Sequence, residues 1–267
     1  MKTIFYIFWI SFSLIAQTAE NYMKNAEAKF ELGNYEGAIK DYTIAIELEP
    51  NNAICYYNRG YIKDILLDYE DAISDYTKAI ELDSNYIDAY NNRGIIKDEL
   101  GDYKGAIQDY NKIISIDSNN ADAYYNRGVV KDKCNDYASA IEDYNKTIKI
   151  DTNYIHAYFN RALDKQNLAD YKGAIKDYNK VIQITPNDIW AYINRGFSKA
   201  ILGNDKEAIQ DYDKAIDIDT KFSYAYYLRG NSNNNLNNNI KACEDWRKAA
   251  DLGYMDAYDM LAKYCQK

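Results

Sequence analysis

The sequence has few of the residues on which catalytic and metal sites depend. It contains one histidine, His156, and two prolines among 267 residues. A single histidine excludes metal sites and proton relays built from several histidines. No glycine-rich phosphate loop or nucleophile elbow is present. Acidic residues recur at regular spacing, whereas an active site needs a singular constellation. We therefore expect a protein that is not an enzyme, with no catalytic residue, no metal site and no cofactor.

Positive charge is also scarce. The chain has 32 lysines and arginines against 41 aspartates and glutamates, a formal net charge of −9. Phosphate backbones bind to cationic surfaces, so nucleic acid is not an expected partner. Hydrophobic residues make up 47% of the chain and charged residues 27%, which is typical of a folded protein with a sizeable core.

Long apolar runs are absent after the first sixteen residues. Residues 1–18 resemble a secretory signal peptide, because Lys2 precedes the apolar segment Ile4–Ile15 and small residues follow at Ala16 and Ala19. This run is shorter than the ~20 residues that span a bilayer, although an uncleaved anchor or an apolar capping helix is an alternative. We expect an exported protein, periplasmic or extracellular, without stable membrane insertion after cleavage.

A period of 34 residues runs without a gap from Ala19 to Asp256. It defines seven repeats: 19–52, 53–86, 87–120, 121–154, 155–188, 189–222 and 223–256. One alanine recurs in all of them, as Ala38, Ala72, Ala106, Ala140, Ala174, Ala208 and Ala242. Each repeat holds two helical patterns separated by a turn cluster such as Leu-Gly-Asp-Tyr. The sequence therefore predicts an all-α fold of tandem helix-turn-helix repeats, closed by a C-terminal capping helix in residues 257–267.

The third repeat shows the pattern most fully, with Tyr90, Gly94, Gly101, Tyr103 and Ala106 at its characteristic places. This 34-residue pattern resembles the tetratricopeptide repeat (TPR) family. The resemblance implies a right-handed α-solenoid, in which first helices line a concave surface and second helices form the outer face. One departure is an arginine at the seventh place of most repeats, where the family usually has leucine.

Most recurrent residues are expected to build the repeats themselves. Eighteen of the 29 tyrosines recur at three places, one in the first helix, one in the turn and one in the second helix, and these should pack between helices. Glycines within the first helices, such as Gly60, should allow close approach to the recurring alanine of the facing helix. Arginines such as Arg93 should pair with second-helix aspartates such as Asp109. A basic ligand groove is the alternative for these arginines.

The remaining first-helix positions are candidates for binding. The resemblance places the second, fifth, sixth, ninth, twelfth and thirteenth residues of each repeat on the concave surface, and an exposed apolar stripe usually marks a binding surface. Asparagine amides there can donate to and accept from a peptide backbone. The groove residues we expect to contact a ligand are Tyr57, Asn58, Tyr61, Asn92, Ile95, Tyr125, Asn126, Val129, Phe159, Asn160, Leu163, Trp190, Ile193, Asn194, Phe197 and Tyr227.

These observations favour a noncatalytic scaffold that binds protein or peptide segments in its concave groove. Asp64, Asp98 and Asp132 make the first half of the groove acidic, so the expected ligand is an extended peptide or a partner helix with apolar anchors and some basic residues. Tight winding of the repeats would instead bury much of the stripe. A glycan-binding or envelope-organising module is the second hypothesis, and a self-assembling structural protein the third. The oligomeric state stays open.

The four cysteines differ in whether a disulfide is expected. Cys55 and Cys134 lie more than two repeats apart, which is too far for a disulfide. Cys243 and Cys265 lie on the last second helix and at the end of the closing helix, which should run antiparallel. A disulfide between them and two buried thiols are both compatible with the sequence.

Overall fold

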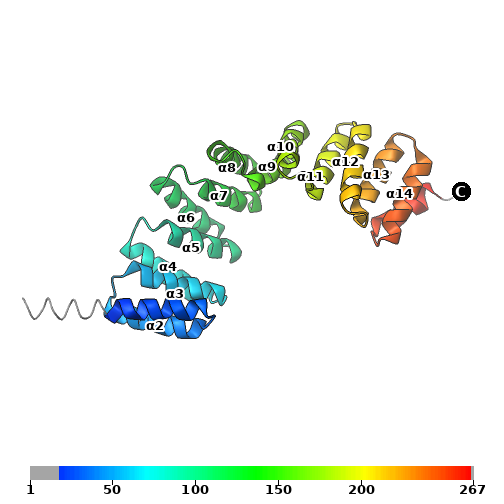
Figure 1. The fold of residues 1–267 in the computed structure, drawn as a ribbon. Coiled ribbons are helices and arrows are strands. Elements are labelled where there is room, and N and C mark those ends of the chain that lie inside the picture. Colours follow the sequence, from blue (N-terminus) through cyan, green and yellow to red (C-terminus); the bar gives the residue numbers. More distant parts are fainter. Residues whose placement is uncertain (1–17, 266–267) are drawn as a thin grey trace, which may run out of the picture. The chain divides into compact units, whose positions relative to one another are not determined.

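The computed structural model describes residues 18–265, which form helices and turns without any strand (Figure 1). The expected signal segment Met1–Ala16 lies outside the described residues. A helix over residues 18–31 comes first. The helices that follow are α2 (Tyr35–Leu48), α3 (Ala53–Ile65), α4 (Tyr69–Leu82), α5 (Ile87–Glu99), α6 (Tyr103–Ile116), α7 (Ala121–Lys133), α8 (Tyr137–Ile150), α9 (Ile155–Asn167), α10 (Tyr171–Ile184), α11 (Ile189–Ile201), α12 (Asp205–Ile218), α13 (Ser223–Asn235), α14 (Asn239–Asp251) and α15 (Asp256–Tyr264). In the described part of the chain, no helix has the length and apolar character needed to cross a membrane.

The helices pack as pairs that follow the repeat register. The odd-numbered helices α3 to α13 begin where the sequence register starts each repeat, and α3, for example, packs on α4 of its own repeat and on α2 of the preceding one. The chain divides into two compact units after Val130. Within each unit successive helix pairs stack on one another, so the predicted all-α solenoid class is confirmed. Helix α15 packs against α14 at the end of the second unit.

The turn between the two helices of a repeat contains one residue with backbone angles in the left-handed region. Gly33, Gly101 and Gly203 have φ between +72° and +79° there, and Leu67 and Ala169 adopt φ of +63° and +60° at the same place. The next residue caps the second helix, as when Asp170 accepts a hydrogen bond from the Gly173 amide at 2.9 Å. The tyrosines assigned to the turn are in fact the first residues of second helices. The short turn and its cap make each helix pair antiparallel.

Second-helix tyrosines and alanines form the core between the helices of each pair. Tyr76, Tyr110, Tyr144, Tyr178 and Tyr212 are all at most 1% exposed, in agreement with the expected packing role of this series. The groups nearest to the first-helix glycines are aromatic rings of the second helix, Tyr110 over Gly94, Tyr212 over Gly196 and Trp246 over Gly230. A Cβ added to Gly196 would approach the Tyr212 ring to 2.6 Å. The glycine thus makes room for a ring, which buries more apolar surface than an alanine.

The expected arginine to aspartate pairs form between the two helices of a repeat. The Arg93 guanidinium donates to both carboxylate oxygens of Asp109 at 2.6 and 3.0 Å, and Lys97 donates to the same carboxylate at 2.8 Å. A third nitrogen of Arg93 reaches Thr77 on the second helix of the preceding repeat at 2.8 Å. The guanidinium also lies 5.6 Å from the centre of the Tyr90 ring. The equivalent pairs are Arg59 with Asp75, Arg161 with Asp177, Arg195 with Asp211 and Arg229 with Asp245.

One buried carboxyl interrupts the apolar pattern of the first helices. Asp164 is 1% exposed and stands at the place that Ile62 and Ile96 occupy in the N-terminal unit. No described side chain or backbone group donates a hydrogen bond to it. Burial, followed by the negative charge of the neighbouring Asp132 carboxyl, raises the pKa of Asp164 to about 8. Both causes disfavour the charged form of the Asp164 carboxyl.

A disulfide links Cys243 and Cys265, whose Cα atoms lie 5.8 Å apart. The disulfide links the end of α15 to α14. The sequence was compatible with a disulfide or with two buried thiols, and the structure has the disulfide. Cys55 is buried and unpaired, and Cys134 is exposed and unpaired.

Substitution of an arginine of these pairs tests how much the pair contributes to the stability of the protein. Arg93→Leu leaves the buried Asp109 carboxylate with Lys97 as its remaining cation, and we expect the free energy of unfolding to fall by about 3 kcal/mol. Urea denaturation followed by circular dichroism measures this change. Lys104→Ala, at an exposed site on α6, is the control and should shift stability by less than about 0.5 kcal/mol. Equal effects of the two substitutions would contradict a structural role for the pair.

The buried Asp164 carboxyl predicts a pH-dependent stability. Its folded-state pKa lies above the unfolded value of ~3.9, so the stabilisation is complete below pH 4 and is lost as pH rises through about 8, with a slope of at most ~1.4 kcal/mol per pH unit. Asp164→Asn should remove this contribution, and the variant should be more stable than the native chain at pH 9 but not at pH 5. Urea titrations at both pH values measure the difference. Asp217→Asn, an exposed carboxylate of the same unit, should leave the native pH dependence intact.

Candidate binding face

The candidate ligand residues of the N-terminal unit lie on one side of its first helices, which we call the first-helix face. Ile54, Tyr61 and Ile95 are the most open of its apolar side chains, with 50%, 41% and 39% of their surface exposed. Neighbouring residues of the face are half-buried: Tyr57, Asn58, Asn92, Tyr125, Asn126 and Val129. The Tyr57 ring packs against Tyr86 of the same repeat at 4.9 Å and against Tyr76 at 5.7 Å. The face is therefore accessible, but its rings are held in fixed positions.

The corresponding face of the C-terminal unit is more aromatic. Trp190 is 53% exposed and makes an edge-to-face contact with Phe222 at 5.2 Å. Phe197 is 37% exposed and lies about two turns further along the same side of α11. Phe159, Asn160, Leu163, Asn194 and Tyr227 are half-buried. Ile193 differs from the expectation, because it is 1% exposed and belongs to the core with Tyr212. A ligand on this face can reach Trp190 and Phe197 but not Ile193.

The asparagines of the face use their amide nitrogens within the protein. Asn58 donates to the Tyr42 hydroxyl at 3.1 Å, and Asn92 donates to the hydroxyls of Tyr57 and Tyr76 at 3.3 and 3.4 Å. Asn194 donates to the Trp190 carbonyl at 2.9 Å. The expected bonds from these amides to a peptide are thus restricted, since the donor side already serves repeat packing. The amide oxygen of Asn58 takes no part in its bond to Tyr42 and stays available at the pocket described below.

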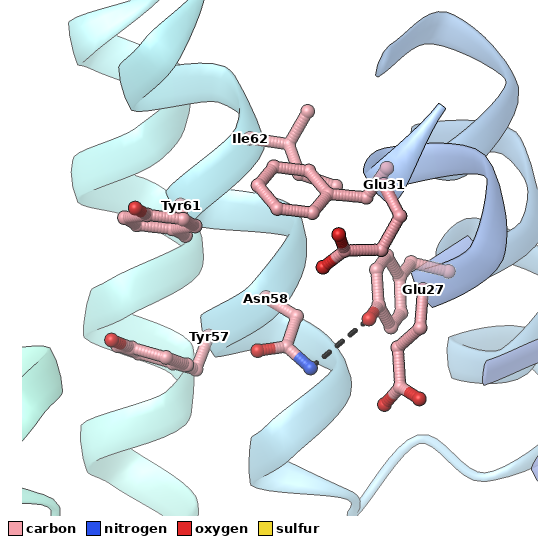
Figure 2. A pocket seen from close by; sticks show the side chains of 8 residues that line it. Glu27, Glu31, Tyr57, Asn58, Tyr61 and Ile62 are labelled. Atoms are coloured by element: carbon pink, nitrogen blue, oxygen red, sulfur yellow. Dashed lines mark hydrogen bonds between the residues drawn. The ribbon is translucent and has the colours of Figure 1, made fainter. Parts of the chain in front are cut away.

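A pocket of about 280 Å³ opens on this face between the helix of residues 18–31 and α3 (Figure 2). Tyr57 and Tyr61 project from α3 with nearly parallel rings, 6.4 Å apart at an angle of 13°. Phe30 faces Tyr61 from the other helix with the ring centres 6.0 Å apart. Glu27 and Glu31 stand on that same helix at the rim of the pocket. We call this site the N-terminal pocket.

The electrostatic environment around the N-terminal pocket is negative. Burial, assisted by the charge of Glu27, raises the pKa of the Tyr42 hydroxyl at its floor to about 12. Burial, followed by the charge of Asp88, also raises the pKa of Tyr57. Asp64 has a raised pKa because it is partly buried and lies near Glu99. Burial is the largest cause of all three shifts, and the negative charges of Glu27, Asp88 and Glu99 add to it. Acidic side chains near the face favour a cationic ligand.

The candidate residues predicted from the sequence did not include the side chains that the first repeat contributes to the N-terminal pocket. Glu27, Phe30 and Glu31 occupy the ninth, twelfth and thirteenth places of that repeat, all of which belong to the expected concave positions. The apolar candidates came from the fifth and ninth places and from Trp190 at the second, so Phe30 at the twelfth place was missed. Reading every one of these places in repeat one would have found all three side chains.

Other candidate chemistries have less support. The ladder arginines bind buried aspartates, so their guanidinium groups do not form a basic ligand groove. His156 is exposed on α9. Among the described residues, no group of three or more histidine, cysteine or acidic side chains is arranged to hold a metal ion.

Solved structures with the same architecture come from several bacteria. A tetratricopeptide repeat protein from Parabacteroides merdae is 22% identical, covers 94% of this chain and 100% of its own, and has a TM-score of 0.65. The C-terminal part of a TPR repeat-containing protein from Cytophaga hutchinsonii is 20% identical over 89% and 98% of the two chains, with a TM-score of 0.77. YrrB, described as a TPR protein with an unusual peptide-binding site, is 28% identical over 69% and 95%, with a TM-score of 0.61. No individual curated protein matches the sequence.

Family models match most of the chain. Models described as TPR repeat match residues 26–63, 99–131 and 169–200. Models described as tetratricopeptide repeat match residues 53–86, 75–108, 121–154 and 191–222. Together these matches span residues 26–154 and 169–222, and the helix pairs of the structure follow the same register. The chain belongs to the tetratricopeptide repeat family.

Proposed function

We propose that this protein is a noncatalytic scaffold that binds an extended peptide segment of a partner protein on its first-helix face. The observation that carries the proposal is that the first helices of each unit keep apolar and aromatic side chains accessible, Tyr61 and Ile95 in the N-terminal unit and Trp190 and Phe197 in the C-terminal unit. These side chains lie outside the buried core of the helix pairs. An apolar row that a soluble protein keeps exposed is a feature of binding surfaces.

Two further facts support this function. This chain belongs to the tetratricopeptide repeat family, whose members typically serve as interaction scaffolds without enzymatic activity. YrrB, at 28% identity, carries a peptide-binding site according to its description. An extended peptide suits such a face because its alternate side chains can contact apolar groups that are spaced along it.

Selection of peptides on the purified protein tests the proposal. A display library of random twelve-residue peptides should yield binders whose affinity falls at least tenfold in the double variant Trp190→Ala with Phe197→Ala. The reason is that both side chains lie exposed on α11 and would lose their contact area with the peptide. Fluorescence anisotropy with the selected peptides measures the dissociation constants.

The matched control removes two other exposed apolar side chains. Ile240 and Met255 are 79% and 73% exposed but lie outside the first-helix face. The variant Ile240→Ala with Met255→Ala should bind the selected peptides like the native chain. Absence of any selected binder, or equal losses in the two double variants, would refute peptide binding on this face. Retention on polysaccharide without binding to peptides would favour the glycan hypothesis instead.

We further propose that the protein acts outside the cytoplasm. Residues 1–18 have the composition of a signal peptide, and a disulfide such as Cys243–Cys265 persists in oxidising compartments. Expressed with its N-terminal segment, the protein should be recovered outside the cytoplasm with a new N-terminus near Ala19. Non-reducing peptide mapping should find Cys243 and Cys265 in one linked fragment. Cytoplasmic recovery with an intact Met1 segment and reduced thiols would contradict export.

A further inference from the structure

We propose that the N-terminal pocket binds an arginine side chain of the partner peptide. This inference rests on the proposed function, since it assigns one side chain of the peptide to one place on the first-helix face. The pocket combines aromatic rings with carboxylates, and it lies between the first helices of repeats one and two (Figure 2). The following contacts and charges select arginine over other occupants.

The two carboxylates at the rim are free to bind a cation. Glu27 and Glu31 are both exposed and four residues apart, so their like charges lie on one side of the helix and repel each other. Neither forms a salt bridge with a described residue. Of the nearby lysines, Lys29 pairs with Asp41 at 2.5 Å, and Lys24 pairs with Glu20 at 2.6 Å while its charge also acts on Glu27. A guanidinium placed between the two glutamates would relieve their repulsion.

The aromatic rings favour a flat cation. Tyr57 and Tyr61 are nearly parallel, and Phe30 is inclined at 52° to Tyr61. Guanidinium groups stack on aromatic faces and bind carboxylates through two parallel hydrogen bonds, whereas an ammonium group acts as a point charge. The oxygen of the Asn58 amide adds a further acceptor, since its nitrogen already bonds to Tyr42. The pocket therefore provides acceptors and ring faces without a cation among its lining side chains.

The protein itself uses the same combination of groups inside its repeats. Arg93 lies 5.6 Å from the centre of the Tyr90 ring while both oxygens of Asp109 bind its guanidinium. Five other repeat arginines lie 5.3 to 5.7 Å from the equivalent tyrosine ring. The N-terminal pocket offers rings and carboxylates of this kind on an open surface, where the arginine must come from another molecule.

Three synthetic peptides that differ in one residue test the inference. Each has nine residues, acetylated and amidated, with alanine and serine around a central arginine, lysine or citrulline. Citrulline keeps the shape of arginine but has no charge. NMR titration of the full chain, read at the ring signals of Tyr57 and Tyr61, should show the arginine peptide binding at least tenfold more tightly than the citrulline peptide, with lysine between them. Added salt should reduce this difference.

Two double variants locate the effect. Glu27→Gln with Glu31→Gln should abolish the preference for arginine over citrulline, because it removes both rim charges while keeping side chains of the same size. Glu36→Gln with Glu47→Gln changes the net charge equally at two exposed sites of α2 and should leave the preference unchanged. Thermal unfolding should show that all four substitutions leave the chain folded.

The outcomes separate this inference from the proposed function. Equal binding of the arginine and citrulline peptides, no binding of any of the three, or the same loss of preference in both double variants would overturn the arginine site. Selected peptides that depend on Trp190 and Phe197 would still support peptide binding in that case. If arginine binds in the N-terminal pocket while no selected peptide depends on Trp190 and Phe197, the arginine site stands and the wider peptide-binding proposal is refuted.

Discussion

The charged pair between an arginine of the first helix and an aspartate of the second is the interaction on which the repeat architecture depends. The Asp109 carboxylate is 3% exposed, and such a group is costly to bury unless its hydrogen-bonding capacity is satisfied. Arg93 and Lys97 satisfy it from the same repeat, and the remaining nitrogen of Arg93 bonds to Thr77 of the preceding repeat. One guanidinium therefore joins three helices. Arg93 and Lys97 are therefore directed to Asp109 and not to the binding face.

Because the arginine and lysine of a first helix face the aspartate, another side of that helix is left for binding. Arg59 and Lys63 are one turn apart and both approach Asp75, so the stripe that carries Tyr57 and Tyr61 must point elsewhere. The second-helix tyrosines hold that stripe in place through their hydroxyl groups, as Tyr76 does with Asn92. The N-terminal pocket is a product of both features, because its rings are fixed and its carboxylates lie beyond the reach of the repeat cations. Rigid rings and unpaired charges are suited to recognising a flexible peptide.

The C-terminal unit replaces part of the apolar core with polar groups. Ser198 and Ser232 occupy the place of Ile62 and Ile96, and both are buried. Gln166 satisfies Ser198 with a hydrogen bond of 2.7 Å, and Asn233 binds the Asp245 carboxylate at 3.0 Å. Asp164 differs from these residues because burial and the charge of Asp132 raise its pKa. The stability of this unit therefore depends on pH through Asp164 as well as on packing.

The sequence by itself determined the period, the helix pairs, the turns and the arginine to aspartate ladder, because each follows from residues that recur within one 34-residue repeat. It also indicated which stripe of the first helices carries variable aromatic side chains. The tertiary structure decided that Ile193 is buried, that tyrosine rings lie over the glycines, that Asp164 meets Asp132 and that Cys243 reaches Cys265. It also brought Phe30, Glu27 and Glu31 to the rings of Tyr57 and Tyr61. These contacts depend on how one helix is rotated against the next, and a rotation is set by the packing of whole interfaces, which no single spacing in the sequence records.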